Sequence, residues 1–338
     1  MIRSVIHLTN FKALLAKNES ETIQTAIEEL TLSDLPTGEC LIKVHYSSVN
    51  YKDALATKKG GGVVRNYPMI PGIDLSGEIV SSTDANFNIG DKVLVTGYQL
   101  GTAHFGGFSE YACVPSKWIV PLPTGLTLKE AMIIGTAGFT AALSIHTLEQ
   151  NPLTVTDSIL VTGATGGVGS MAIAMLNKLG YQQITAASRK ATASTDYLHN
   201  IGATTVTTPA ELQLEKIKPL EKQLWQGIID PVGGHGLTQW LAQLSYGGTL
   251  ALSGNTGGLH FDSTVLPFIL RGIHLTGIDS VSCPMALRKS LWNRLATTMK
   301  PDHLEMMIDN EITLNELPTA FNKILSGEMT GRTLVRIH

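Results

Sequence analysis

Residues 160–169 read LVTGATGGVG, and this stretch decides the fold. Four glycines stand between positions 163 and 169, directly behind a short apolar run. Because glycine in quantity weakens both strand and helix, such a cluster indicates a sharp bend or a close approach to the backbone. The preceding segment TDSILVTG (156–163) is typical of a buried parallel strand. The following segment SMAIAMLNKLG (170–180) is typical of a helix that ends at a glycine.

Gly163, Gly166 and Gly169 thus form a G-x-x-G-x-x-G motif between a strand and a helix. In a dinucleotide site the first glycine permits the turn, the second lets the backbone reach a pyrophosphate, and the third allows the helix to pack closely on the strand. An ordinary strand-to-helix turn is the alternative, and the strand–helix–strand context argues against it. The predicted cofactor contacts in this loop are Gly163, Thr165, Gly166, Gly167, Val168 and Gly169.

The next expected strand, ITAASR (184–189), ends in Ala187, Ser188, Arg189 and Lys190. An NAD site usually places an acidic residue here to accept a hydrogen bond from the ribose 2′-hydroxyl group, and none is present. A hydroxyl group followed by two cations suits the charge of a 2′-phosphate, and Arg is a planar donor of several hydrogen bonds. This pattern favours NADPH over NADH, with these four residues as cofactor contacts. A solvated pair of loop charges is the alternative.

Strand and helix patterns alternate from the glycine loop to IHLTGID (273–279), which predicts a doubly wound α/β sheet. Up to about residue 125 the chain is instead rich in short β-branched or aromatic runs between Gly, Pro and Asp, such as ECLIKVHYSSV (39–49). The end of the chain is mostly helical and closes with the strand-like RTLVRI (332–337), which we expect to return to the first domain. We predict two domains, one formed by 1–126 with 282–338 and one by 127–281.

The composition of the 338 residues, with 43% hydrophobic and 16% charged residues and a net charge of −3, indicates a compact soluble protein without the basic excess that nucleic-acid or membrane-surface binding favours. The expected partner is a small molecule. We see neither a signal-peptide pattern nor an uncharged apolar run long enough for a membrane span, so we expect a cytoplasmic protein. Cys40, Cys113 and Cys283 are odd in number and widely spaced, which predicts neither a disulfide framework nor a cysteine-based zinc site.

The order of a β-rich domain, a dinucleotide domain with VTGATGGVG and a C-terminal return resembles the medium-chain dehydrogenase/reductase superfamily. Within it, the chain is similar to the quinone oxidoreductase group that contains the bacterial NADPH-dependent acryloyl-CoA reductases. The segments that carry this finer resemblance are NYKDALA (50–56), YPMIPGIDLSGEIV (67–80), GTAGFTAALS (135–144), DPVGG (230–234), PFILRG (267–272) and GIDSV (277–281). The resemblance implies a GroES-like β-rich catalytic domain, a Rossmann NADPH-binding domain, and a homodimer that pairs through HLTGIDSV (274–281).

The zinc alcohol dehydrogenases of this superfamily carry Cys, His and Cys as ligands of the catalytic metal. At the matching places this chain has Asn50, Ile73 and Ala137, which cannot replace thiolate and imidazole ligands, so we expect no catalytic zinc. Without zinc, oxidation of an alcohol is difficult. Reduction of an electron-poor C=C bond conjugated to a carbonyl group needs only positioning, a hydride and stabilisation of the enolate oxygen.

In the resembling family, the Tyr of the N-Y-K-D segment lies at the nicotinamide and the substrate. Tyr51 is therefore the candidate hydrogen-bond or proton donor, with Asn50 beside it. The alternative is that Tyr51 only packs on the nicotinamide ring while water supplies the proton. Lys52 and Asp53 are expected to form a local structural pair. The resemblance also implies cofactor contacts at Asn255, Ile269 and Ser280.

The basic segment ATKKGGGVVRN (56–66) carries Lys58, Lys59 and Arg65 on a glycine-rich loop, where they are candidates for binding the phosphates of coenzyme A. A solvated basic loop is the alternative. The leading hypothesis is a reductase of a short enoyl-CoA such as acryloyl-CoA. A quinone or enone reductase is the second, and a non-catalytic NADPH-binding sensor is a third of a different class.

Overall fold

The computed structural model describes residues 10–338 except residue 21, so residues 1–9, the first part of the segment searched for a signal peptide, lie outside the described part. The chain divides into two compact units. Unit 1 comprises the residues up to Thr136 together with Val281–Asn293 and Ile308–His338. Unit 2 comprises Ala137–Ser280 and Arg294–Met307.

Unit 1 is built on a seven-stranded sheet in the order β14-β15-β3-β4-β5-β7, with β6 paired to β3. Its pairs are antiparallel except for the parallel pair of β14 and β15. The strands are β3 (Cys40–Ser48), β4 (Asp74–Ser82), β5 (Lys92–Thr96), β6 (Tyr111–Val114), β7 (Val120–Pro121), β14 (Ile308–Ile312) and β15 (Arg332–Arg336). Their apolar residues, including Ile42, Leu75 and Val93, form a fully buried core.

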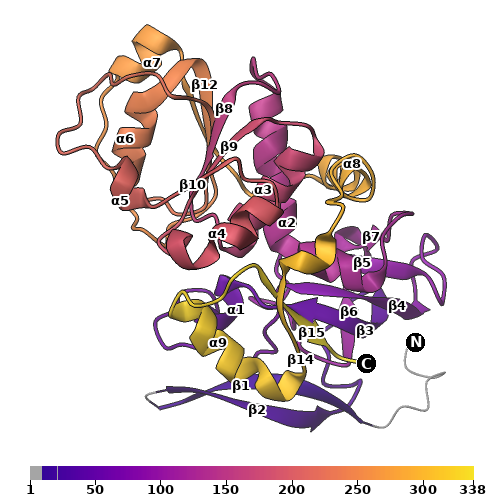
Figure 1. The fold of residues 1–338 in the computed structure, drawn as a ribbon. Helices are drawn as coiled ribbons and strands as arrows, with labels where there is room; N and C mark the ends of the chain where they lie inside the picture. The colour runs from indigo at the N-terminus through magenta and orange to yellow at the C-terminus, as the bar shows by residue number, and fades with distance from the viewer. Residues whose placement is uncertain (1–9, 21) are drawn as a thin grey trace. The chain divides into compact units, whose positions relative to one another are not determined.

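A hairpin of β1 (Phe11–Glu19) and β2 (Thr22–Leu30) adds a two-stranded sheet to unit 1. Short helices complete the unit; Figure 1 shows α9 next to this hairpin, and α1 packs against α9. They are α1 (Tyr51–Ala56), the 3₁₀ turns η2 (Ser116–Trp118) and η4 (Leu314–Glu316), α9 (Leu317–Leu325) and most of α8 (Met285–Leu295). A second apolar cluster, which includes Leu14, Ile70 and Phe321, packs these elements together.

Unit 2 is a six-stranded parallel sheet in the order β10-β9-β8-β11-β12-β13. The strands are β8 (Ser158–Val161), β9 (Gln183–Ala187), β10 (Thr205–Thr207), β11 (Trp225–Asp230), β12 (Leu244–Leu252) and β13 (His274–Gly277). The helices are α3 (Gly167–Lys178), α4 (Ala191–Asn200), α5 (Pro209–Leu212), α6 (Gly236–Gln243), α7 (Leu266–Arg271) and the 3₁₀ turn η3 (Leu304–Met307). Figure 1 shows α3 and α4 on one side of the sheet and α6 on the other, which is the doubly wound architecture that the sequence predicts.

The strand order of unit 2 reverses between β8 and β11, because β9 and β10 follow β8 on one side and β11 to β13 follow on the other. In open α/β sheets, ligands bind beyond the carboxyl ends of the strands at such a switch point. The glycine-rich stretch 163–169 begins directly after β8 and therefore stands at this point.

Helix α2 (Leu128–Glu149) has one interruption, at Gly135, where φ is 51° and ψ is −160°. Its length and its mean hydropathy of 1.4 over 18 residues match those of a membrane span, contrary to our expectation from the sequence. Because 83% of that window is buried inside the protein, α2 has the character of a core helix.

The units differ from the domain boundaries drawn from the sequence at three places. Residues 127–136 and residue 281, which we assigned to the second domain, lie in unit 1. Residues 294–307, which we assigned to the first domain, lie in unit 2. Two ion pairs join this segment to the rest of unit 2: Arg294 contacts Glu149 at 2.7 Å, and Asp302 contacts Lys178. Neither pair could be read from the sequence, because the partners are more than a hundred residues apart.

Candidate functional site

The glycine loop turns at Gly163, whose φ of 54° lies in the left-handed region that favours glycine. The turn is fixed by two backbone hydrogen bonds, from the N–H of Gly166 to the oxygen of Gly163 at 2.9 Å and from the N–H of Ala164 to the oxygen of Ala187 at 3.1 Å. Helix α3 then begins at Gly167 with Gly166 as its N-cap. The first N–H groups of α3 therefore stand at the carboxyl edge of the sheet, where they suit an anion.

Gly169 is buried against the loop that precedes it. A Cβ atom at this position would lie 2.4 Å from the oxygen of Gly163 and 2.8 Å from Cα of Ala164. At Gly166 the nearest contact of an added Cβ would be 3.3 Å from the same oxygen. The glycines thus make a bare backbone cradle, and these residues fit the pyrophosphate of a dinucleotide.

The end of β9 is joined to the glycine loop by a pair of hydroxyl groups. Thr165 Oγ1 and Ser188 Oγ lie 2.9 Å apart in a buried hydrogen bond, and Ser188 Oγ also accepts from the N–H of Lys190 at 3.1 Å. Arg189, which lies between Ser188 and Lys190 in the sequence, is exposed. The structure therefore brings together the predicted pyrophosphate loop and the predicted 2′-phosphate residues at one edge of unit 2.

Two further loops meet at the same edge. The carboxylate of Asp230, at the end of β11, accepts from the N–H groups of Val232 at 2.7 Å and Gly233 at 2.6 Å, while burial raises its pKa. The loop after β12 packs directly on this turn, since a Cβ atom at Gly254 would lie 1.9 Å from the oxygen of Pro231. Asn255 is exposed on that second loop, beside the DPVGG turn.

The remaining predicted cofactor residues lie on other elements of unit 2. Ile269 is on α7 and is 68% exposed, and Ser280 follows β13 at the carboxyl edge of the sheet. An exposed apolar side chain such as Ile269 is equally suited to a ligand or to another protein surface. The contact predicted for either residue stays a prediction.

In unit 1, Tyr51 and Asn50 lie at the start of α1 with different surroundings. Tyr51 is the first residue of the helix and is 40% exposed. The Asn50 carboxamide is buried, donates to Asp74 Oδ2 at 2.8 Å, and accepts from Arg332 Nη1 at 3.2 Å. Sequence reasoning missed Asp74 and Arg332. The available signal was a charged residue at the first position of each strand, Asp74 in β4 and Arg332 in β15.

Asp53 also belongs to this buried group. Its oxygens accept from the N–H groups of Asn50 at 2.8 Å and Ile73 at 2.9 Å, rather than from Lys52 as expected. Burial, with a smaller contribution from the negative charge of Asp74, raises the pKa of Asp53 to about 7. The expected local pair with Lys52 is therefore replaced by a cap on the helix backbone, because two buried N–H groups need an acceptor.

The residues of this region do not fit a catalytic zinc ion. The Asn50 carboxamide is already committed to Asp74 and Arg332, and Ile73 has no ligand atom. Throughout residues 10–338, apart from 21, no group of three or more His, Cys, Asp or Glu side chains is arranged to hold a metal.

The basic residues proposed for a coenzyme A group are exposed beside α1. Lys58, Lys59 and Arg65 all face solvent. Lys59 Nζ donates to the backbone oxygen of Ser20 at 2.9 Å, which links the loop to the β1–β2 hairpin. Lys58 and Arg65 are therefore the better candidates for an anionic ligand.

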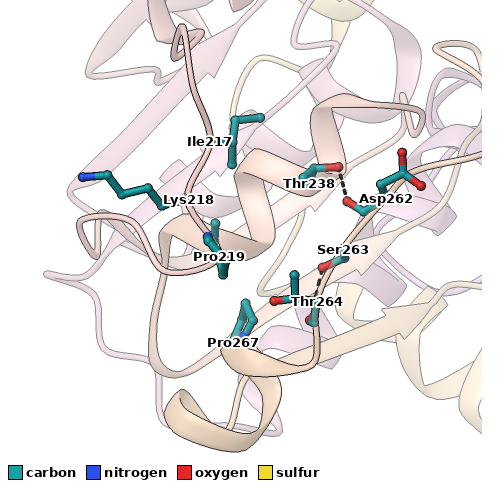
Figure 2. Close-up of a pocket in the computed structure, with 9 residues that line it drawn as sticks. Ile217, Lys218, Pro219, Thr238, Asp262, Ser263, Thr264 and Pro267 are labelled. Atoms are coloured by element: carbon teal, nitrogen blue, oxygen red, sulfur yellow. Dashed lines mark hydrogen bonds between the residues drawn. The ribbon is translucent and has the colours of Figure 1, made fainter.

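A cavity of about 180 Å³ opens elsewhere on unit 2, between α6 and the segments that precede β11 and α7 (Figure 2). Thr238 Oγ1 donates to the backbone oxygen of Asp262 on its wall. The residues that line the cavity are Ile217, Lys218, Pro219, Thr238, Ala242, Asp262, Ser263, Thr264 and Pro267. No predicted cofactor or catalytic residue lines it, so we do not assign the reaction to this cavity.

Comparison with protein families gives two matches. Residues 36–124 match the alcohol dehydrogenase GroES-like domain, and residues 167–297 match the zinc-binding dehydrogenase family. The first match covers most of the strands of unit 1, and the second begins inside the glycine loop. Both matches agree with the GroES-like and Rossmann domains that the resemblance implies.

Individual proteins are similar over almost the whole chain. YhfP of Bacillus subtilis, provisionally named a quinone oxidoreductase, is 49% identical over 97% of this chain and 99% of its own. Its crystal structure with NAD bound superposes with a TM-score of 0.94 over 98% of this chain and 100% of that one. Acrylyl-CoA reductase AcuI of Ruegeria pomeroyi is 45% identical over 97% of this chain and 99% of its own. The YhdH oxidoreductase of Salmonella enterica, solved with NADP, is 43% identical over 97% of this chain and 100% of its own, with a TM-score of 0.91.

Proposed function

This chain belongs to the medium-chain dehydrogenase/reductase superfamily, and we propose that it is a zinc-independent, NADPH-dependent reductase of a C=C bond conjugated to a carbonyl group. Two observations carry the proposal: unit 2 holds a glycine cradle joined to the Ser188–Arg189 segment, and the zinc-ligand positions in unit 1 hold Asn50 and Ile73. Such a protein binds a dinucleotide but polarises no alcohol with a metal.

NADPH is the proposed cofactor because Ser188, Arg189 and Lys190 offer one hydroxyl group and two cations where NADH would need a carboxylate. The relatives are divided: YhdH was solved with NADP and YhfP with NAD. Direct titration of this protein with NADPH and with NADH decides the matter. We expect tighter binding of NADPH, and equal affinities would overturn the assignment.

The proposed substrate is a short enoyl-CoA such as acryloyl-CoA. The similarity to an acrylyl-CoA reductase supports this class, as do Lys58 and Arg65, exposed cations suited to the phosphates of coenzyme A. A quinone or an enone is the second candidate, because YhfP carries a provisional quinone-oxidoreductase name. Both classes share an electron-poor C=C bond conjugated to a carbonyl group.

When bound, the reduced nicotinamide supplies a hydride to the β-carbon of the substrate. The negative charge that would develop on the conjugated oxygen is stabilised by a hydrogen-bond donor, and a proton delivered to the α-carbon completes the reduction. Tyr51 is the proposed donor, since this residue is 40% exposed, whereas the Asn50 carboxamide is buried and already hydrogen-bonded to Asp74 and Arg332. If Tyr51 only packs on the ring, water supplies the proton and Tyr51→Phe keeps most of the activity.

The test follows the loss of NADPH absorbance with acryloyl-CoA and, separately, with a simple quinone, and repeats both with NADH. Fast turnover of acryloyl-CoA supports the proposal, and turnover of the quinone alone moves the substrate to the second class. If NADPH binds and neither acceptor is reduced, the chain is a nucleotide-binding sensor rather than a reductase.

We also propose that the protein is a cytoplasmic homodimer that pairs through β13, the last strand of its sheet in unit 2. Val265, Ile269 and Leu270 on and beside α7 are 56–68% exposed, and α7 precedes this strand directly. Such an apolar group beside a sheet edge suits a second copy of the same surface. Light scattering of the wild type and of Val265→Asp tests this: we expect a dimer that the variant weakens, and a monomeric wild type would contradict it.

A further inference from the structure

A pair of opposite charges lies sealed inside unit 1. The side chains of Asp74 and Arg332 are 0% and 3% exposed, and Arg332 Nη2 lies 3.7 Å from Asp74 Oδ2. Burying two charges is costly unless their hydrogen-bonding capacity is filled by well-placed partners. The partners of this pair therefore show which parts of the chain it holds.

Asp74 accepts hydrogen bonds from two separate segments. Its Oδ2 accepts from Ser48 Oγ at 2.7 Å and from Asn50 Nδ2 at 2.8 Å, both at the end of β3. The same atom accepts from the N–H of Thr136 at 2.9 Å, and Thr136 Oγ1 donates to Asp74 Oδ1. One carboxylate thus joins the entry to α1 with the interruption in α2.

Arg332 makes the complementary set of contacts from β15. It donates to Ser48 Oγ at 2.7 Å, to Asn50 Oδ1 at 3.2 Å and to the backbone oxygen of Ile133 at 3.1 Å. The guanidinium group and the carboxylate therefore hold the Asn50 carboxamide from its acceptor end and its donor end. Only one orientation of this amide satisfies both charges.

The backbone of the same residue is fixed as well, because the N–H of Asn50 donates to Asp53 Oδ2 at 2.8 Å. The next residue is Tyr51, whose side chain is 40% exposed. Room for the arrangement comes from Gly135, where a Cβ atom would lie 2.6 Å from both Arg332 Nη2 and Asp74 Oδ2.

We propose that Asp74 and Arg332 are positioning residues of the reductase. They fix the conformation of Asn50 and of the adjoining Tyr51 backbone, and so hold the Tyr51 phenol group in the position from which it reaches the substrate. This inference rests on the proposed function. A misplaced donor lowers the rate of the chemical step without weakening the binding of substrate or cofactor. A pair that only stabilised unit 1 would leave the turnover of each folded molecule unchanged.

The experiment uses the isosteric variant Asp74→Asn and the charge-conserving variant Arg332→Lys, with Arg336→Lys as the matched control. Arg336 lies on the same strand, but its side chain is 57% exposed and pairs with Glu311 at 3.7 Å. For each folded protein we measure kcat and KM with acryloyl-CoA and with a quinone, and the Kd for NADPH by its fluorescence. We expect kcat to fall by about 10- to 100-fold in both network variants, with Kd and KM within about twofold of wild type, and the control to behave as wild type.

A second readout does not depend on activity. Amide hydrogen exchange in the NADPH-bound protein should quicken by at least about tenfold over residues 50–56 in the network variants, and not in Arg336→Lys. Unchanged kcat in folded Asp74→Asn and Arg332→Lys would overturn the positioning role. If the wild type reduces neither acceptor, the proposed function fails. In that case the hydrogen-exchange result still tests whether the Asp74–Arg332 pair fixes the start of α1, and unchanged exchange over α1 would reject that claim.

Discussion

Two short segments are each held in one conformation, and the means differ. One is the segment at Asn50 in unit 1, and the other is the glycine loop that follows β8 in unit 2. In unit 1, two buried charges and an amide fill one another's hydrogen-bonding capacity. In unit 2 the loop is held by backbone hydrogen bonds and by the Thr165–Ser188 hydroxyl pair, and the essential feature is that no side chain is present at Gly163 and Gly169. The first region is therefore sensitive to the removal of atoms and the second to their addition.

The largest effect is expected from removal of one buried charge. Arg332→Met leaves Asp74 buried without its counter-ion, which should lower the free energy of unfolding by about 3–5 kcal/mol. Arg336→Met, which removes an exposed partner of Glu311, should cost less than about 1 kcal/mol. Urea denaturation of both variants measures this difference, and similar costs would remove the distinction between the two arginines.

The pH dependence of stability should single out Asp53. Its pKa of about 7 in the folded protein lies above its ordinary value of 3.8, so the stability gained by keeping it neutral is complete below about pH 4 and is lost as the pH rises toward 7. Asp53→Asn cannot ionise, so its free energy of unfolding should improve relative to wild type over that range, by up to about 4 kcal/mol. Denaturation at several pH values tests this, and parallel curves would contradict it.

Adding one methyl group should disturb the glycine loop. Gly169→Ala places a Cβ atom 2.4 Å from the oxygen of Gly163, so the backbone must shift, at a cost of about 1–3 kcal/mol in the free energy of unfolding. NADPH binding should weaken as well. Gly277→Ala is the matched control, since an added Cβ there meets nothing within 4 Å. Equal stability and affinity in the two variants would show that the loop tolerates a side chain.

A smaller and more selective effect is expected at Arg189. Arg189→Ala should weaken NADPH by about tenfold and leave NADH within about twofold, because only the 2′-phosphate loses a charged partner. The two cofactors serve as each other's control in the same titration. An equal loss for both would assign Arg189 to the fold of the loop instead of to the phosphate.

The smallest effect is expected from the exposed loop beside α1. Lys58→Ala should raise KM for acryloyl-CoA by about two- to threefold, because an exposed ion pair is weak and screened by salt. A quinone, which carries no phosphate, should show no change with the same variant. A uniform change with both acceptors would mean that this loop supports the active site and not the coenzyme.

Local patterns in the sequence predicted most of unit 2. The strand before the glycines, the helix after them and the alternation up to β13 all form as expected, since each element is specified by its own neighbours. The β1–β2 hairpin and strand β14 were not predicted. The hairpin segment Thr22–Leu30 is at most half-buried and carries two charges, Glu28 and Glu29, so its apolar alternation is weak.

The candidate site likewise contains residues that the sequence predicted and residues that it did not. The glycines and Ser188 could be found because they lie within one strand–helix–strand unit. Asp74 and Arg332 are 258 positions apart, and neither has a nearby partner in the sequence that would reveal the contact. Asp53 was singled out, but its expected partner was wrong, because sequence neighbours suggest Lys52 while burial favours the backbone N–H groups.

The two units are interleaved along the chain, with transitions after Thr136, Ser280, Asn293 and Met307. A chimaera that exchanged the whole nucleotide-binding unit with that of a relative would therefore need four crossovers in the gene. A two-crossover exchange of Ala137–Ser280 would leave Arg294 and Asp302 facing foreign partners in place of Glu149 and Lys178. Recombination in this lineage should tolerate exchanged cofactor units best when the 294–307 segment travels with them.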